Sequence, residues 1–190
     1  MSGRPPGRVR IIAGYKRGHR LKVPPGEVRP TSDMVREAIF DALGPVVGLR
    51  VLDLFAGTGA MGLEALSRGA AHCVFVEVDP KVVTVLRENI AALGYEGSSE
   101  VLAVSYTAGL AALVERGCQF DLLFVDPPYR MLPEVEETLA SVVPSLVSRN
   151  GLVVMESSRS VHPTLGGTTV FDRVYGSTRV TMVGFRRNDV

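Results

Sequence analysis

The sequence has few of the residues that build metal sites and disulfide frameworks. Its 190 residues include two cysteines and three histidines. Neither Cys73 nor Cys118 belongs to a CxxC motif and the histidines are scattered, so we expect free thiols in a cytoplasmic protein and no metal site. No apolar run approaches the roughly 18–20 residues that span a membrane, so no membrane contact is expected. The basic N-terminus also lacks the apolar segment of a secretory signal.

Acidic residues are almost missing from the first 30 positions. This segment holds eight lysines and arginines against one acid, Glu27, so the formal net charge of +1 conceals a basic segment joined to an acidic body. Apolar residues such as Val9, Ile11 and Leu21 are interleaved with the charges, which a disordered tail would not need. We therefore expect an ordered basic arm, residues 1–30, that binds nucleic-acid phosphates, followed by a main domain, residues 31–190. The candidate phosphate contacts are Arg8, Arg10, Lys16, Arg17 and Arg20.

Beyond the arm, short apolar runs alternate with segments of helical periodicity that mostly end in glycine. The runs predict parallel strands at 50–54, 72–78, 101–104, 120–125 and 152–156. The periodic segments predict helices at 33–43, 60–68, 80–93, 108–116 and 134–147. Polar and apolar residues alternate in 168–175 and 179–185, which predicts an antiparallel edge hairpin. The order predicts an α/β, Rossmann-like domain with a mostly parallel seven-stranded sheet.

The sequence also predicts which face of the first helix packs inward and how the arm folds. In the helix at 33–43, Met34, Ala38, Ile39 and Ala42 should lie near one face. In the arm, residues 9–13 and 20–23 can pair as a short hairpin.

The stretch FDLLFVDPPYR, Phe120 to Arg130, ends a buried strand in chemically useful groups. Two prolines stop the strand, because proline has no N–H for the sheet and fixes φ. A carboxylate, Asp126, a stiff backbone at Pro127 and Pro128, and the ring of Tyr129 remain. In open α/β sheets ligands bind at this end of the strands, so the stretch is a candidate binding site.

A second candidate site is the stretch VLDLFAGTGAMG. Gly57, Gly59 and Gly62 form a GxGxxG pattern between a strand and a helix, and Glu77 lies 20 residues beyond Gly57, where a carboxylate can bind ribose hydroxyls. The glycines alone are a weak signal and would suggest a dinucleotide such as NAD. Asp53 favours S-adenosylmethionine (SAM), because a carboxylate beside the turn repels a diphosphate and suits an ammonium or sulfonium group.

The two stretches should share one crevice, since the first and fourth strands of such a sheet lie side by side. A methyl donor beside Asp-Pro-Pro-Tyr indicates methylation of a planar exocyclic amine. The Asp126 carboxylate and the Pro127 carbonyl would hold the amine N–H groups, and Tyr129 would stack on the base. The target base would have to leave its helix or be unpaired. This chemistry does not separate guanine from adenine.

Four segments together resemble the bacterial guanine-N2 methyltransferases of 16S ribosomal RNA. They are RIIAGYKRGHRLKVPPGEVRPTSDMVREAIFDALG, VLDLFAGTGAMGLEALSRGA, VFVEVD and LLFVDPPY. The resemblance runs from about Arg10 to Arg186 and implies a monomeric class I SAM-dependent methyltransferase that modifies one guanine of 16S rRNA in the small ribosomal subunit. Its N-terminal pattern is the family-specific part, whereas the SAM and DPPY motifs are shared with adenine-N6 enzymes.

The resemblance also implies roles for individual residues. Arg29 and Thr31 would lie near the methionine end of SAM and the target, and Asp126 to Tyr129 would form the catalytic turn. Thr107, before Ala108, stands where the family usually has Asp or Asn against the adenine, so a backbone N–H is the expected contact there. The residues expected to bind the cofactor are Asp53, Phe55, Ala56, Gly57, Thr58, Gly59, Glu77, Val78, Thr107 and Ala108.

Three alternatives stay open on the sequence. The first is an amino-methyltransferase acting on adenine N6 of DNA or RNA, although 190 residues leave little room for a DNA target-recognition domain. The second is a non-catalytic RNA-binding or assembly factor, against which the intact Asp53, Glu77 and Asp126 argue. The third is an NAD enzyme.

Overall fold

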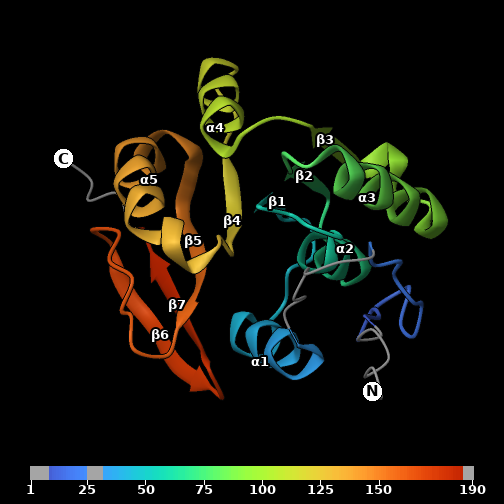
Figure 1. The fold of residues 1–190 in the computed structure, drawn as a ribbon, viewed down its shortest axis with the longest axis horizontal. Coiled ribbons are helices and arrows are strands. Elements are labelled where there is room, and N and C mark those ends of the chain that lie inside the picture. Colours follow the sequence, from blue (N-terminus) through green and yellow to red (C-terminus); the bar gives the residue numbers. More distant parts are fainter. Residues whose placement is uncertain (1–8, 25–31, 186–190) are drawn as a thin grey trace, which may run out of the picture.

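A seven-stranded sheet forms the centre of the fold in the computed structural model, which describes residues 9–24 and 32–185 (Figure 1). The strand order is β3-β2-β1-β4-β5-β7-β6. The strands β1 to β5 pair in parallel, and β7 is antiparallel to both β5 and β6. The sheet therefore has the predicted form. The strands are β1 (Arg50–Leu54), β2 (His72–Val76), β3 (Ser99–Leu102), β4 (Phe120–Val125), β5 (Val147–Ser158), β6 (Thr168–Tyr175) and β7 (Thr178–Gly184).

Helices cover both faces of the sheet. They are α1 (Asp33–Leu43), α2 (Ala60–Ser67), α3 (Pro80–Leu93), α4 (Tyr106–Glu115) and α5 (Leu132–Leu146), with short 3-10 turns η1 (Glu96–Ser98) and η2 (Tyr129–Met131). Because successive strand side chains point to opposite faces, the core has two layers. Val51 and Phe124 pack with α1, α2 and α3, whereas Leu52 and Val125 pack with α4 and α5. None of the described helices is both long and apolar enough to cross a membrane.

The face of α1 that packs inward differs from the predicted one. Met34 is 61% exposed and Ala42 is exposed, whereas Val35, Arg36 and Phe40 are buried beside Ile39. The prediction was right for Ile39 but wrong for Met34 and Ala42, since the face that packs inward runs along Val35, Arg36, Ile39 and Phe40 and so includes a charged residue. The buried Arg36 is stabilised by Asp33, which accepts a hydrogen bond of 2.8 Å from Nη2.

The described part of the basic arm, residues 9–24, is ordered and packs beside α2 (Figure 1). Val9, Ile11 and Leu21 are buried in the same core cluster as α1, α2 and α3. The predicted hairpin is confirmed only in part: the Ile11 and Leu21 N–H groups donate across it to His19 and Val9, but the sole β-bridge among the described residues here joins Arg10 to Arg20. Arg8, Arg29 and Thr31 lie outside the described residues.

Candidate active site

The sheet brings the ends of β1, β2 and β4 to one edge. Leu54, the last residue of β1, is paired with Val76 of β2 on one side and with Val125 of β4 on the other. The chain segments that follow these strands are the glycine loop, the segment after β2 that begins at Glu77, and the Asp-Pro-Pro-Tyr turn. The predicted adjacency of the two stretches is therefore confirmed by the strand pairing, whereas a shared crevice stays a prediction.

Two carboxylates, one on β1 and one directly after β2, hold the glycine loop and the start of α2. The buried Asp53 accepts a hydrogen bond of 2.9 Å from the Gly62 N–H in the first turns of α2. Glu77 accepts one of 2.9 Å from the Gly57 N–H with its Oε2, and its Oε1 accepts from the Val78 and Asp79 N–H groups. At Gly59, where φ is +83°, a Cβ would come within 2.5 Å of the Leu86 side chain. The loop is thus fixed where the ribose and methionine of SAM were predicted to bind.

The electrostatics of this edge suit a cationic ligand. Burial, joined by the nearby charges of Asp126 and Glu77, raises the pKa of Asp53 to about 8, against the opposing effect of the hydrogen bond from Gly62. A cation placed among these three carboxyl groups would stabilise their ionised forms. The donor set therefore fits a ligand with an ammonium or sulfonium group, as Asp53 indicated in the sequence, and disfavours a diphosphate.

The four residues of the Asp-Pro-Pro-Tyr turn differ in their exposure to solvent. Asp126 is half-buried, Pro127 is buried, and Pro128 and Tyr129 are exposed, the latter by 48%. The turn continues into η2, where the Met131 N–H donates to the Pro128 carbonyl at 2.8 Å. A rigid turn with an accessible phenol ring is consistent with stacking on a planar base.

The helix α4 begins at Tyr106, two residues before the predicted start at residue 108. Ser105 caps this helix and accepts from the Ala108 N–H at 3.2 Å, so that N–H is already engaged. Thr107 is exposed and its hydroxyl lies 3.0 Å from that of Ser105.

Phe55, which follows β1, has a positive φ of 68°, and its ring centroid lies 5.1 Å from that of Tyr106. Strained backbone of this kind is concentrated at ligand sites.

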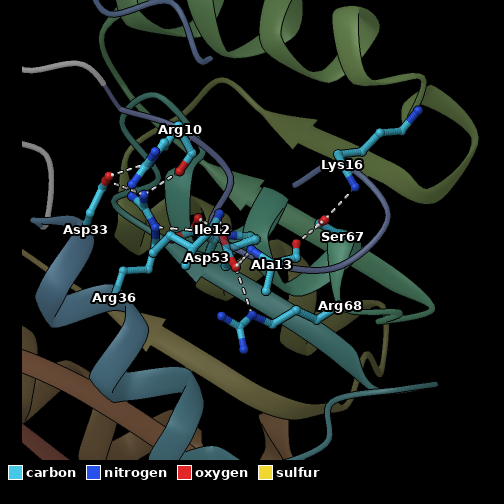
Figure 2. A network of polar contacts seen from close by, with 11 residues as sticks. Arg10, Ile12, Ala13, Lys16, Asp33, Arg36, Asp53, Ser67 and Arg68 are labelled. Carbon is cyan, nitrogen blue, oxygen red and sulfur yellow. Dashed lines mark hydrogen bonds and ion pairs between the residues drawn. The ribbon is translucent and has the colours of Figure 1, made fainter. Parts of the chain in front are cut away.

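The basic arm is held by a network around Glu64 of α2, which sequence reasoning missed. Figure 2 labels the partners of Glu64 in this network, Ile12, Ala13, Arg36 and Arg68. This fully buried carboxylate accepts from the N–H groups of Ile12 at 2.7 Å and Ala13 at 3.0 Å. It also bonds to Arg68 Nε at 2.8 Å and lies 3.9 Å from Arg36 Nε. A lone Glu inside an apolar helix such as AMGLEALS was the only available signal.

The charged side chains of the arm are not equally available. Arg10 forms an ion pair with Asp33 at 3.2 Å, and the Lys16 ammonium lies 5.8 Å from the Tyr95 ring centroid. Arg17 and Arg20 are exposed and pair with no carboxylate in the described part of the chain. Tyr15, two residues before Arg17 in the same turn, is 85% exposed. The arm therefore presents unneutralised cations beside an exposed aromatic ring.

The strand order, the antiparallel β7 and the glycine loop after β1 define the class I methyltransferase fold. More specifically, the chain belongs to the family described as "Conserved hypothetical protein 95", whose model matches residues 9–184.

Several relatives are named as methyltransferases. "Putative rRNA methyltransferase YlbH" of Bacillus subtilis (strain 168) is 36% identical over 184 residues, covering 92% of this chain and 97% of that protein. "Ribosomal RNA small subunit methyltransferase D" of Escherichia coli (strain K12) is 42% identical over 154 residues, covering 80% of this chain and 72% of that protein. These names agree with the family resemblance seen in the sequence.

Solved structures show the same relationship. The one titled "Putative methyltransferase yhhF from Escherichia coli" is 35% identical with a TM-score of 0.82, covering 95% of this chain and 99% of that one. An RNA methyltransferase from Salinibacter ruber in complex with S-adenosyl-L-homocysteine shares the fold, with 17% identity, a TM-score of 0.65, and coverage of 85% and 96%.

Proposed function

We propose that this protein transfers a methyl group from SAM to the exocyclic N2 amine of a guanine in 16S rRNA. The observation that carries the proposal is the convergence of Asp53, Glu77 and the Asp126 turn on one edge of a methyltransferase fold. The relatives named as small-subunit rRNA methyltransferases supply the substrate class. The protein would act as a monomer in the cytoplasm, on the small subunit or its precursor.

In this proposal the glycine loop binds the cofactor and the neighbouring strand ends orient it. Asp53 provides negative charge near the methionine end, while Glu77 accepts hydrogen bonds from the ribose hydroxyls. The loop residues that would contact SAM are Phe55, Ala56, Gly57, Thr58 and Gly59, joined by Val78 after β2. Thr107 and Ala108 would lie beside the adenine of SAM. SAM supplies an electrophilic methyl group on a sulfonium.

The catalytic work of the chain is to position the amine. The Asp126 carboxylate and the Pro127 carbonyl accept hydrogen bonds from the guanine N2 hydrogens, so that the nitrogen lone pair faces the methyl group. Tyr129 stacks on the base beside the stiff Pro128. Methyl transfer would release S-adenosylhomocysteine and leave the amine nitrogen positively charged, and Asp126 would stabilise that charge until the extra proton passes to solvent water. The arm, including Arg29, binds the RNA together with Thr31, which directly follows the arm.

The test is methyl transfer to small subunits isolated from cells that lack the modification. Labelled SAM should deliver methyl to 16S rRNA, and nucleoside analysis should identify N2-methylguanosine. Asp126→Ala should lower the rate by about 100-fold or more, because positioning of this kind contributes several kcal/mol, while SAM affinity changes little. Glu137→Gln, an exposed carboxylate on α5, is the matched control and should keep full activity.

Other products would favour the other hypotheses. Methyl label in adenine N6 would support the adenine enzyme, and SAM binding without transfer to any form of the subunit would support a non-catalytic factor. NAD should give no thermal stabilisation, whereas SAM or S-adenosylhomocysteine should.

A further inference from the structure

Three side chains of α2 and α3 form hydrogen bonds with the backbone of the arm and not with the side chains of the arm. Glu64 accepts from two arm N–H groups, as described above (Figure 2). Ser67 donates to the Ala13 carbonyl at 2.6 Å and accepts from the Lys16 N–H at 3.0 Å. Asn89 of α3 accepts from the Lys22 N–H at 2.8 Å and donates to the Lys22 carbonyl at 3.0 Å. These hydrogen bonds hold the arm through its backbone and involve none of its basic side chains.

Asn89 differs from the other two because it also contacts the glycine loop. Its Nδ2 donates to the Thr58 carbonyl at 3.0 Å, in addition to the Lys22 carbonyl. Both amide hydrogens and the amide oxygen are therefore engaged, and the side chain is only 2% exposed. One buried amide joins the loop between β1 and α2 to a segment 36 residues earlier in the chain.

We propose that Asn89 is a positioning residue that couples docking of the arm to the geometry of the cofactor loop. A buried amide that loses one of these partners is left with an unsatisfied polar group, which is unfavourable. The docked arm therefore favours the loop conformation in which Thr58 is held, and a ligand that fixes the loop favours the docked arm. This inference rests on the proposed function only in taking the loop to bind SAM.

Coupling of this kind is reciprocal. If RNA bound to the arm stabilises its docked position, RNA must raise the affinity for SAM, and SAM must raise the affinity for RNA by the same factor. The protein would then bind its methyl donor most tightly when a substrate is on the arm.

The first test uses the unmodified chain and S-adenosylhomocysteine, without RNA. Hydrogen exchange should slow at the Gly57 amide, in the loop, and also at the Lys22, Ile12 and Ala13 amides of the arm. In Asn89→Ala the slowing at Gly57 should persist while that in the arm disappears. If saturating S-adenosylhomocysteine slows Gly57 but leaves the arm amides of the unmodified chain unchanged, the inference is wrong.

The second test measures S-adenosylhomocysteine affinity by calorimetry in paired variants. Asn89→Ala should weaken binding by about tenfold, as expected for a buried hydrogen bond. Glu88→Gln is the control, because it removes only the exposed ion pair of 2.8 Å between Lys22 and Glu88. It should change the affinity by less than about twofold, the range of an exposed pair. Equal affinities of the two variants would contradict the inference.

A glycine pair displaces the arm without touching Asn89. A Cβ at Gly14 would lie 1.8 Å from the Ser67 carbonyl oxygen, whereas one at Gly18 meets nothing within 4 Å, and both residues have positive φ. Gly14→Ala should therefore weaken S-adenosylhomocysteine binding and Gly18→Ala should not. In the double variant with Asn89→Ala, Gly14→Ala should weaken S-adenosylhomocysteine binding little further, because both substitutions break the same connection between the arm and the loop. Fully additive losses of binding free energy would refute the coupling.

These experiments separate the inference from the proposed function. A chain that binds S-adenosylhomocysteine but shows no link to the arm refutes the inference alone. A chain that shows the link but methylates no small subunit refutes the proposed substrate alone. An unmodified chain that binds no S-adenosylhomocysteine refutes both.

Discussion

Asp53 is a residue whose pKa differs strongly from that of the same side chain in water. Its pKa is raised to about 8, because burial penalises the charge more than the Gly62 N–H stabilises it, and Asp126 and Glu77 add repulsion. The folded chain therefore binds a proton that the unfolded chain has already released. The stability from this proton is fully present below the unfolded pKa of about 3.8, and is lost as the pH rises through about 8.

Asp53→Asn should remove this dependence while keeping an oxygen that can accept from Gly62. Near pH 4 the two chains should unfold at similar urea concentrations. As the pH rises towards 8, Asp53→Asn should become the more stable, by at most about 1.4 kcal/mol per pH unit. Urea unfolding at a series of pH values measures the difference. Parallel stability curves for the two chains would show that Asp53 ionises normally. The variant should also bind SAM more weakly, since the negative charge is gone.

Among the elements, α2 joins the cofactor loop to the arm, and Glu64 is its central residue. Glu64→Gln keeps the shape of the side chain but leaves the buried Arg36 without this counter-charge. Arg36 Nε and Nη1 already lack hydrogen-bond partners among the described residues, and burial lowers the pKa of this guanidinium. We expect a decrease of about 3–5 kcal/mol in the free energy of unfolding, as for other broken buried ion pairs.

Urea unfolding measures the effect of Glu64→Gln, and proteolysis reports whether the arm has detached. The matched control is Glu37→Gln on the exposed side of α1, which should change stability by less than about 0.5 kcal/mol. If Glu64→Gln were as mild as the control, the network around Glu64 would contribute nothing to holding the arm.

The bounds of helices and strands with strong local sequence signals were predicted to the residue, whereas bounds that depend on caps or on pairing with other strands were not. The bounds of α1, α3, β1, β4 and β6 agree with the sequence prediction. The start of α4 was misplaced because the cap at Ser105 took precedence over apolar periodicity, and β5 is longer because its pairing with β4 begins at Val147.

The same distinction applies to the site. Parallel strands must end at one edge, so the meeting of the glycine loop, Glu77 and the Asp126 turn could be predicted from strand order alone. The roles of Glu64 and Asn89 could not, because the partners that matter are backbone N–H and carbonyl groups 31 to 67 residues earlier, and backbone groups carry no sequence signal.

Across the entire protein, positive charge is concentrated on a segment that is anchored by its backbone. Replacing Lys16, Arg17 and Arg20 by Gln should therefore weaken RNA binding without releasing the arm or changing SAM affinity. The dependence of log K on log salt should become shallower by about 0.7–0.9 for each phosphate that the variant no longer neutralises. Arg10→Gln should have a smaller effect, because Asp33 already neutralises part of its charge.

The matched control is Arg173→Gln, which removes an exposed positive charge on β6, at the opposite edge of the sheet from the strands nearest the arm. If binding follows total charge alone, this variant should lower the salt slope as much as Arg17→Gln does. If the arm provides the RNA surface, only the arm variants should change the slope. Filter binding of 16S rRNA fragments at a series of salt concentrations, with calorimetry of SAM binding in parallel, distinguishes the two. An unchanged slope in the triple arm variant would show that RNA binds elsewhere, and that the docked arm serves only the cofactor loop.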